Sequence, residues 1–283
     1  MPSVQEYLSE MRRDLVHGSG WYFEKISELL SGIREEELPA LRRSLPSIRP
    51  GMASISNIYE LLKTRDDWST DEARDLGRKL SEFKALSFER LRRQARGTKI
   101  GRAVTISYSK AVELFLMEAG VESVTLIQSK PGNEWKVAQR EYGKFAEVTP
   151  IPESAMIALM GNVDSVIIGF DGIFASGYLT NKVGTHPLCI AAREVGKKVV
   201  AVGESFKSSV KPPGNVFMIN TRISGKKVVI PLFDFVPLNL VGLLVTDIGT
   251  FVSPKVRDVV ALHEEFIKKM IPGKGATPMQ GKQ

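Results

Sequence analysis

The chain has 283 residues, of which 43% are apolar and 25% are charged, so it is long enough to bury a full hydrophobic core. No segment approaches the eighteen or more consecutive apolar residues of a membrane span. Residues 1–14 also lack the apolar centre of a signal peptide. We therefore expect a soluble, cytoplasmic protein without membrane association.

The cysteine and histidine content excludes most metal and disulfide chemistry. The single cysteine, Cys189, rules out an intrachain disulfide framework and any zinc site built on cysteine pairs. The three histidines, His17, His186 and His263, lie far apart and show no metal-ligand spacing. The sequence contains neither a Walker-type phosphate loop nor a G-x-G-x-x-G motif after a strand. We expect no metal and no cofactor.

A net charge of +7 favours anionic partners, which include phosphorylated metabolites, RNA and acidic protein surfaces. The densest basic stretch lies at residues 90–102, where five arginines and one lysine are opposed nearby only by Glu89. RNA binding through this stretch is one hypothesis. Because no aromatic residue is interleaved with these charges as a stacking platform, we favour a solvated helix end and linker.

Residues 1–95 are predicted to form a small helical domain. Apolar residues recur at helical spacing over residues 4–15, a stripe that includes Leu15, and again over residues 23–33 and 76–86. Pro50 and Gly51 interrupt the helical pattern, and Ser69 or Thr70 is the candidate N-cap of the last helix.

Residues 96–271 are predicted to form an α/β domain, because short runs rich in Val and Ile alternate with amphipathic segments. The expected strands are residues 102–107, 123–129, 145–151, 165–171, 197–205, 227–233 and 241–247. The expected helices are residues 109–120, 134–142, 152–161, 181–196 and 254–270. Strands that are apolar on successive residues are buried on both faces, which is typical of a parallel sheet covered by helices. We therefore predict a Rossmann-like, doubly wound sheet, followed by a mobile tail at residues 272–283.

Ligands of such sheets bind beyond the carboxyl ends of the strands. Asp171 stands at the end of the predicted strand at residues 165–171, and Asn181 and Lys182 are expected to open the next helix. Asp171 is therefore a candidate general acid or base, and Lys182 with the helix N-terminus is a candidate phosphate site. The simpler interpretation is a carboxylate that fixes its own loop, an N-cap at Asn181 and a solvated Lys182.

Two further strand ends are expected at the same edge of the sheet. Ser107 and Ser109 follow the first strand and are candidate hydroxyl contacts or an N-cap, whereas Lys130 follows the second and is a candidate anion contact. For each residue taken alone, a cap or a solvated loop charge is the more common role.

Four segments resemble a known family, in the family's own order. GFDGIFASGYLTNKVGT resembles the signature G-A-D-x-[IV]-x-x-[ND]-G-x-x-x-N-K-x-G-T, which joins the subunits of translation initiation factor 2B with methylthioribose-1-phosphate and ribose-1,5-bisphosphate isomerases. RPGMASISN, ISYSKAVELFL and FDFVPLNLVGLLVTDIG resemble three more of its motifs. Together the segments span residues 49–249. The resemblance implies the phosphosugar-isomerase-like α/β fold.

In the isomerases of this family, an aspartate and a cysteine flank a sugar phosphate and carry out the aldose-to-ketose conversion. Asp171 matches the aspartate, whereas Ser107 stands at the position of the cysteine. Cys189 lies within the later predicted helix and is interpreted as a buried apolar residue. A thiol can be tuned to act as a base near neutral pH, but a serine hydroxyl needs an added base. The resemblance therefore implies a family member that has lost the catalytic thiol.

Other departures separate this chain from the enzymes. Lys130 stands where the isomerases favour an arginine, so a bidentate phosphate clamp would become a point charge. Ile106 replaces a histidine common before this site. The segment that contains Ser107, Tyr108 and Ser109 is closer to the initiation-factor branch. The ligand-binding residues implied by the resemblance are Arg49, Ser107, Tyr108, Ser109, Lys130, Asp171, Asn181 and Lys182.

The leading hypothesis is a non-catalytic regulatory or scaffold subunit similar to the alpha, beta and delta subunits of initiation factor 2B. Its expected partners are a phosphorylated small molecule, either a sugar phosphate or a nucleotide, initiation factor 2 subunits, and further copies of itself in a dimer or larger oligomer. The alternative is a working aldose–ketose isomerase, an intramolecular oxidoreductase, that uses Asp171 with Ser107 or a water molecule.

Overall fold

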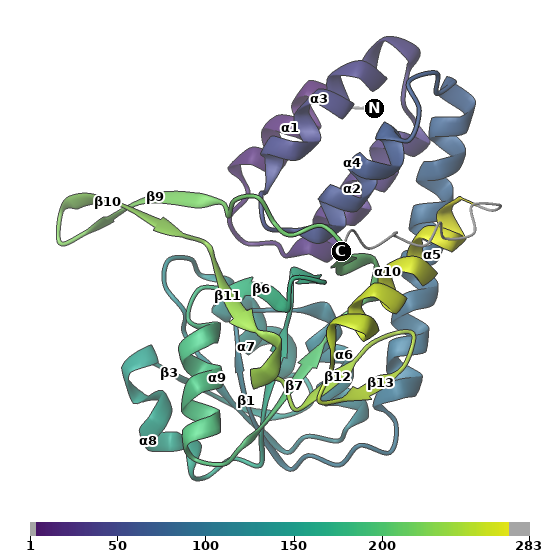
Figure 1. The fold of residues 1–283 in the computed structure, drawn as a ribbon. Helices are drawn as coiled ribbons and strands as arrows, with labels where there is room; N and C mark the ends of the chain where they lie inside the picture. Colours follow the sequence, from purple (N-terminus) through teal and green to yellow (C-terminus); the bar gives the residue numbers. More distant parts are fainter. Residues whose placement is uncertain (1–3, 272–283) are drawn as a thin grey trace, which may run out of the picture.

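The computed structural model describes residues 4–271, and the first part of this range is entirely helical (Figure 1). Its elements are α1 (Val4–Arg13), α2 (Ser19–Ser31), the short 3₁₀ helix η1 (Glu35–Glu37), α3 (Leu38–Ile48), α4 (Ala53–Lys63) and α5 (Thr70–Ala95). Apolar side chains of these helices form one buried cluster, as their helical spacing predicts. The predicted tail at residues 272–283 lies outside the described residues.

Local signals in the sequence set most helix ends in this part. Ser69 caps α5, since its hydroxyl accepts a hydrogen bond of 3.2 Å from the backbone N–H of Glu72. The break at Pro50 and Gly51 separates α3 from α4, as predicted. The prediction was wrong at Leu15, because α1 ends at Arg13 and the side chain of Leu15 is exposed. A chain segment without regular structure therefore connects α1 to α2.

A seven-stranded sheet forms the centre of the α/β part. Its strands are β1 (Arg102–Ile106), β2 (Ser123–Ile127), β3 (Glu147–Ile151), β4 (Ser165–Gly169), β7 (Lys198–Val202), β12 (Leu243–Val245) and β13 (Thr250–Val252). The strand order is β13-β12-β7-β4-β1-β2-β3, and every pair is parallel except β12 with β13. The predicted doubly wound, mostly parallel sheet is confirmed. The winding direction reverses between β1 and β4, which is where such sheets open a crevice for ligands.

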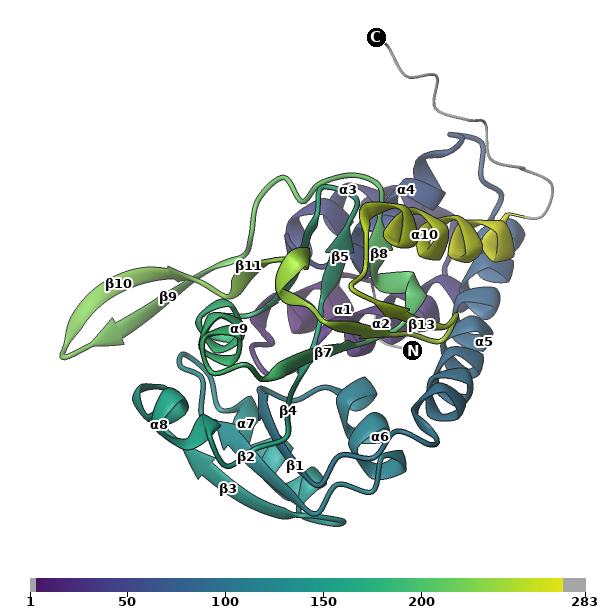
Figure 2. The ribbon, with the colours of Figure 1, turned by 60° about the horizontal axis from the view of Figure 1, so that its bottom comes forward.

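Helices cover both faces of this sheet (Figures 1 and 2). They are α6 (Lys110–Glu118), α7 (Glu134–Tyr142), α8 (Met156–Met160) with the 3₁₀ helix η2 (Glu153–Ala155), α9 (Thr185–Glu194) and α10 (Val256–Met270). Side chains of β4 alternate between the two layers. Val166 and Ile168 belong to the apolar cluster of α9 and α10, whereas Ile167 packs in the cluster of α5 and α6. This double burial explains the unbroken apolar run of β4.

A second sheet and a ribbon of two strands were not predicted. The sheet has the order β11-β6-β5-β8 and contains β5 (Gly172–Phe174), β6 (Tyr178–Lys182), β8 (Ser208–Ser209), which follows the 3₁₀ helix η3 (Ser205–Lys207), and β11 (Phe233–Pro237), which precedes the 3₁₀ helix η4 (Leu238–Leu240). The predicted helix start at Asn181 and Lys182 is therefore wrong, because both residues lie in β6 and α9 begins at Thr185. Extended pairing with β11 outweighs the N-cap preference of Asn181.

The ribbon consists of β9 (Met218–Ile223) and β10 (Lys226–Pro231), which pair only with each other. Residues 227–233 were predicted as one strand of the main sheet, but β10 instead lies in this ribbon. Figures 1 and 2 show the ribbon extending away from the body of the molecule. Its two ends are joined at the body, where the N–H of Leu232 donates a hydrogen bond of 2.8 Å to the carbonyl of Phe217.

The helical and α/β parts share buried surface. Phe83 of α5 contacts Phe266 of α10 with ring centroids 5.4 Å apart, and Phe23 of α2 stacks on Phe206 at 4.1 Å. The far end of α5 instead packs with α6 in the core of the α/β part. The domain boundary near residue 95 stays a prediction. No helix within residues 4–271 is long and apolar enough to cross a membrane.

Candidate functional site

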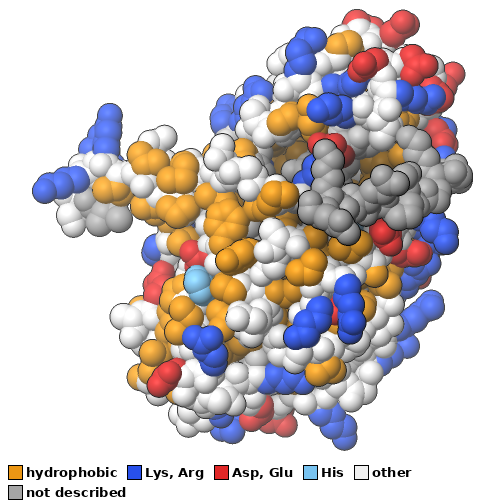
Figure 3. Space-filling model, in the orientation of Figure 1, with side chains coloured by type: hydrophobic (Ala, Val, Ile, Leu, Met, Phe, Trp, Pro, Cys, Tyr) orange, Lys and Arg blue, Asp and Glu red, His pale blue; other side chains and the backbone are white. Residues whose placement is uncertain are grey.

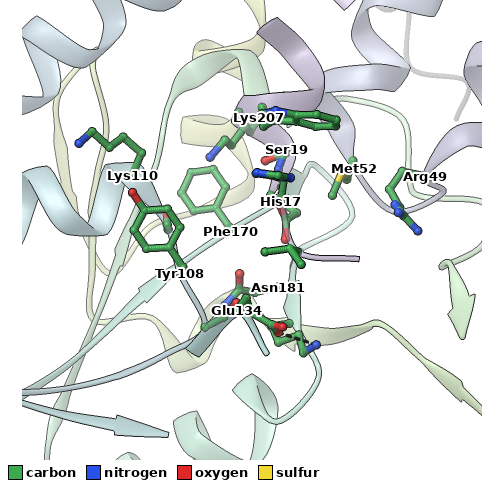
Figure 4. Close-up of a pocket in the computed structure, with 18 of the residues that line it drawn as sticks. His17, Ser19, Arg49, Met52, Tyr108, Lys110, Glu134, Phe170, Asn181 and Lys207 are labelled. Atoms are coloured by element: carbon green, nitrogen blue, oxygen red, sulfur yellow. Dashed lines mark hydrogen bonds and ion pairs between the residues drawn. The ribbon is translucent and has the colours of Figure 1, made fainter. Parts of the chain in front are cut away.

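A cavity of about 270 Å³ lies between the N-terminal helices and the carboxyl ends of β1 and β4 (Figure 4). Its walls come from the α1–α2 connection, the residues before α4, one side of α5, and the segments that follow β1, β4 and β7. It therefore opens at the crevice where the sheet reverses its winding. Seven of the predicted site residues line it, namely Arg49, Ser107, Tyr108, Ser109, Asp171, Asn181 and Lys182.

The eighth predicted residue, Lys130, is not part of the cavity wall. Its side chain is exposed, and its ammonium group lies 5.8 Å from the ring centroid of Trp135. Its backbone N–H donates a hydrogen bond of 2.6 Å to the carboxylate of Glu153. The strand order brings the end of β2 to the same edge of the sheet, but the Lys130 side chain is not directed to the ligand crevice.

The segment after β1 brings three polar side chains to the cavity. Ser107 has a positive φ of 62°, and Ser109 caps α6 by accepting a hydrogen bond of 3.5 Å from the N–H of Val112. Tyr108 donates a hydrogen bond of 2.6 Å to the carboxylate of Glu113, and burial raises the pKa of this tyrosine well above its usual range. Tyr108 is therefore a neutral hydrogen-bonding group at any physiological pH.

Asp171 joins the α/β part to the helical part. Its carboxylate accepts a hydrogen bond of 2.9 Å from the N–H of Ser19, the first residue of α2. Its own N–H donates to the carbonyl of Thr180, and its carbonyl accepts from the N–H of Ala53. The carboxylate acts as a helix cap for α2 while it also faces the cavity.

Asn181 and Lys182 reach the cavity from β6, and both side chains are almost fully buried. The ammonium group of Lys182 lies 2.5 Å from a carboxylate oxygen of Glu134, at the start of α7, and also donates to the carbonyl of Pro131. Asn181 donates a hydrogen bond of 3.0 Å to the hydroxyl of Thr185. The positive charge of Lys182 is therefore balanced by the carboxylate of Glu134 within the protein itself.

Arg49 is the most completely buried cation of the cavity, with an exposed fraction of 2%. Its Nε and Nη2 atoms donate to the hydroxyl of Tyr22 at 2.9 and 2.6 Å, and its guanidinium plane lies 4.0 Å from the ring centroid of Phe217. Its Nη1 atom is buried and has no hydrogen-bond partner among the described residues. This nitrogen is therefore an unpaired buried donor next to the cavity.

The sequence-based prediction missed several residues that line the cavity. His17 lies in the connection before α2 and Ser19 is the first residue of α2, and no local signal places this segment against a sheet 150 residues later. Glu204 and Lys207 follow β7 directly, so the rule for strand ends that identified Asp171 would also have identified them. His17 stacks on Trp21 at 4.5 Å and lies 2.6 Å from the carboxylate of Asp14.

Cys189, the single cysteine of the chain, lies in α9 and does not line the cavity. Its side chain is fully buried, and burial raises the pKa of the thiol to about 12. The cavity wall after β1 carries the hydroxyl of Ser107, and the thiol of Cys189 lies elsewhere. Cys189 is a buried apolar residue, as predicted.

The basic stretch at residues 90–102 is partly neutralised on the surface. Arg92 and Arg96 both pair with Glu118, at 2.7 and 3.3 Å, and Arg102 pairs with Asp164 at 3.5 Å. These pairs reduce the net positive charge that RNA would meet there, which weakens the RNA hypothesis.

Two curated proteins that are similar to this chain have different described functions. It is 25% identical over 279 residues to a translation initiation factor eIF-2B subunit 2-like protein of Pyrococcus horikoshii, with 89% of this chain and 97% of the relative covered. It is 32% identical over 126 residues to ribose 1,5-bisphosphate isomerase of Archaeoglobus fulgidus, with 40% of each chain covered. The first match extends over nearly both chains, and the second over less than half of each.

Solved structures with the same fold come from both branches. The initiation factor eIF-2B of P. horikoshii superposes with a TM-score of 0.81 at 23% identity, covering 92% of this chain and all of the other. The 5-methylthioribose 1-phosphate isomerase of the same organism has a TM-score of 0.71 at 19% identity, covering 93% and 88%. A chain of the tetrameric eIF2B-beta2-delta2 complex from C. thermophilum has a TM-score of 0.66 at 16% identity, covering 92% and 93%.

The family model described as the initiation factor 2 subunit family matches residues 21–253, which include every residue that lines the cavity except those at positions 15–20. On this match over most of its length, the chain belongs to the initiation factor 2 subunit family.

Proposed function

We propose that this protein is a regulatory or scaffold subunit of the initiation factor 2B type, whose cavity binds a phosphorylated small molecule without turning it over. The observation that carries the proposal is a cavity lined by seven of the predicted site residues, with a hydroxyl, at Ser107, in the position that the resemblance assigns to the isomerase thiol. A serine hydroxyl needs an added base to become a nucleophile or a base itself, which a tuned thiol does not.

The charges around the cavity support a phosphorylated ligand. Arg49 has an unpaired Nη1 donor beside the cavity, whereas the ammonium groups of Lys182 and Lys207 are paired with Glu134 and Glu204. A phosphate dianion is well matched to a guanidinium group, which donates in a fixed planar geometry. A sugar phosphate and a nucleotide both carry such a group, and both remain within the proposed ligand class.

We also propose that copies of this chain assemble through the α/β part, and that initiation factor 2 subunits are partners in the cytoplasm. Large apolar side chains are exposed on the paired strands β6 and β11, at Tyr178 and Phe235, and on the ribbon, at Met218 and Val229. Figure 3 shows hydrophobic side chains gathered from the ribbon across to the body of the molecule. An apolar area of this kind on a soluble protein is typical of a protein–protein interface.

The assembly is tested by the mass of the particle in solution. Sedimentation of the full chain is expected to show a dimer or a larger oligomer, and Tyr178→Lys combined with Phe235→Lys is expected to shift it toward the monomer. The matched control is Leu86→Lys, which places the same charge at an exposed apolar position on α5. A wild-type chain that sediments as a monomer at micromolar concentration contradicts this part of the proposal.

A working isomerase is the second candidate, because Asp171 lies in the cavity and one relative is a ribose 1,5-bisphosphate isomerase.

Both functions are tested on the same purified protein. Thermal-shift measurements with a panel of sugar phosphates and nucleotides are expected to show stabilisation, since a ligand of the folded state raises the melting temperature. Isomerase assays with ribose 1,5-bisphosphate and methylthioribose 1-phosphate are expected to show no turnover. Turnover that disappears in Asp171→Asn would establish the enzyme and exclude the regulatory subunit.

A further inference from the structure

Asp247 lies in the turn after β12, and its carboxyl group is hydrogen-bonded to two other segments of the chain. The residue is 3% exposed and is not part of the cavity wall. One carboxyl oxygen accepts a hydrogen bond of 2.6 Å from the N–H of Ser205. The other accepts bonds of 2.9 and 3.0 Å from the hydroxyl groups of Ser205 and Ser87. Three donors from two segments therefore meet at this buried group.

The two serines lie beside residues that line the cavity. Ser87 belongs to α5 and follows Lys84 by about one helical turn. Ser205 begins η3 and lies between Glu204 and Lys207. Lys84, Glu204 and Lys207 all line the cavity. The hydrogen bonds of Asp247 therefore join a cavity wall that comes from the helical part to one that comes from the α/β part.

Ser87 lies where α5 passes from one hydrophobic core to the other. Phe83, four residues earlier, packs in the cluster of the N-terminal helices, whereas Leu91, four residues later, packs in the cluster of β1 and α6. Figure 1 shows α5 running alongside both parts of the molecule. The hydroxyl of Ser87 also lies 2.8 Å from the carbonyl oxygen of Phe83, so its proton is shared between this carbonyl and Asp247. An anchor at this position holds both halves of α5 against the end of β12.

The turn that carries Asp247 is held in place by its own hydrogen bonds. Thr246 is fully buried, and its Oγ1 atom accepts bonds of 3.2 Å from the N–H groups of Ile248 and Gly249. Burial raises the pKa of the Asp247 carboxyl group, whereas its three donors act in the opposite direction. A buried carboxyl group that loses its donors is strongly disfavoured. The two serines are therefore constrained to follow the position of Asp247.

We infer that Asp247 is a positioning residue that connects these two walls of the cavity, so that a displacement of α5 is transmitted to η3 and a displacement of η3 to α5. The inference goes beyond the proposed function, because it does not depend on which ligand the cavity binds. A chain of hydrogen bonds between two rigid elements is a physical route for such coupling.

The test removes one end of this connection and measures the other end. Ser87→Ala loses the hydroxyl that bonds Asp247 and leaves Ser205 unchanged. The matched control is Ser27→Ala in α2, because Ser27 is also fully buried and donates to the carbonyl four residues earlier, at Phe23. Hydrogen exchange of the full chain is measured without ligand, relative to the N–H groups of β4. Ser87→Ala is expected to speed exchange in η3 about fivefold, and the control less than about twofold.

The coupling is expected to be reciprocal. Ser205→Ala, which removes only the other hydroxyl, should speed exchange of the α5 N–H groups around Ser87 by a similar factor. Asp247→Asn keeps one oxygen as an acceptor for the N–H of Ser205 but places an amide nitrogen, which cannot accept, beside the two hydroxyl groups. Exchange in α5 and in η3 should therefore rise together in this variant.

Two results would overturn the inference. One is unchanged exchange in η3 of Ser87→Ala, and the other is equal acceleration in Ser87→Ala and in the Ser27→Ala control. Because no ligand is added, both results are independent of the proposed function. A thermal-shift panel without stabilisation contradicts ligand binding alone, and a negative exchange experiment contradicts only the connection through Asp247.

Discussion

The carboxylate of Asp171 accepts a hydrogen bond of 2.9 Å from the N–H of Ser19, a residue 152 positions earlier in the chain. The side chain of Asp171 thereby lines the cavity and also caps α2, the second helix of the N-terminal part. Any ligand that draws this carboxylate away from Ser19 changes the contact between the two parts of the molecule.

Removing this cap is expected to destabilise the protein modestly. Asp171→Ala should lower the free energy of unfolding by about 1 kcal/mol, because α2 loses a charged acceptor at its first N–H group. Asp171→Asn should cost less, since an amide oxygen can still accept that hydrogen bond. Thermal melting without ligand measures both variants, and Asp67→Ala, at an exposed aspartate, is the control. Equal stability of wild type and Asp171→Ala would show that the cap contributes nothing.

The native protein is expected to have no reactive thiol. Cys189 is fully buried and the pKa of its thiol is raised to about 12, so thiolate is scarce and inaccessible at pH 8. Titration with a disulfide reagent should label one thiol per chain only after denaturation. Ser107→Cys should add one thiol that reacts in the folded state, because position 107 lines the cavity. Fast labelling of the wild-type protein under native conditions would contradict the position of Cys189.

The ion pair between Lys182 and Glu134 is expected to depend on both partners. Each side chain is only 5% exposed, so Lys182→Met or Glu134→Gln alone should cost about 3–5 kcal/mol by leaving one buried charge unpaired. The double variant should cost less than the sum of the single variants. Chemical denaturation of all four proteins completes the cycle. The exposed pair Lys211 and Glu60 is the control, and its coupling should stay at about 0–1 kcal/mol. Strictly additive costs at Lys182 and Glu134 would contradict the pairing.

Stability is expected to fall on mild acidification because of His263. Burial lowers the pKa of this histidine, whose Nδ1–H donates a hydrogen bond of 3.0 Å to the carbonyl of Ser208. The unfolded chain therefore takes up a proton at higher pH than the folded protein does. The stabilisation is complete above the unfolded pKa of about 6.5 and is lost as the pH falls through the folded value. Melting temperatures between pH 7.5 and pH 5.5 should drop less in His263→Gln than in the wild type.

Sequence reasoning predicted the parts of this fold that short-range patterns determine. The parallel strands were identified because their side chains are apolar on successive residues, and the cap at Ser69 follows from residue type alone. Strands β5, β6 and β8 were missed, since they have two to five residues each and their sheet is completed by pairing of β6 with β11 and of β5 with β8, which lie far apart in the sequence. Asn181 and Lys182 were predicted as a helix start because their pairing with β11, more than 50 residues later, leaves no local signal.

The candidate site was predicted only where a strand end or a motif marks it. Ser107 and Asp171 were found in this way, and the structure brings them to one cavity. The side-chain direction of Lys130 depends on the path of its loop, which no residue pattern encodes. Ser19 and Arg49 reach the cavity from the helical part, and only the resemblance pointed to Arg49. Tertiary packing, which residue patterns do not report, decides these positions.

The ribbon formed by β9 and β10 leaves the body and returns to it at one place, where Phe217 and Leu232 are hydrogen-bonded to each other. Its length therefore has no effect on the path of the chain before or after it. Insertions or deletions at its tip, around Ser224 and Gly225, change the reach of the molecule and leave the sheet register and the cavity unaltered. A segment of this kind can therefore vary in length while the interior stays the same.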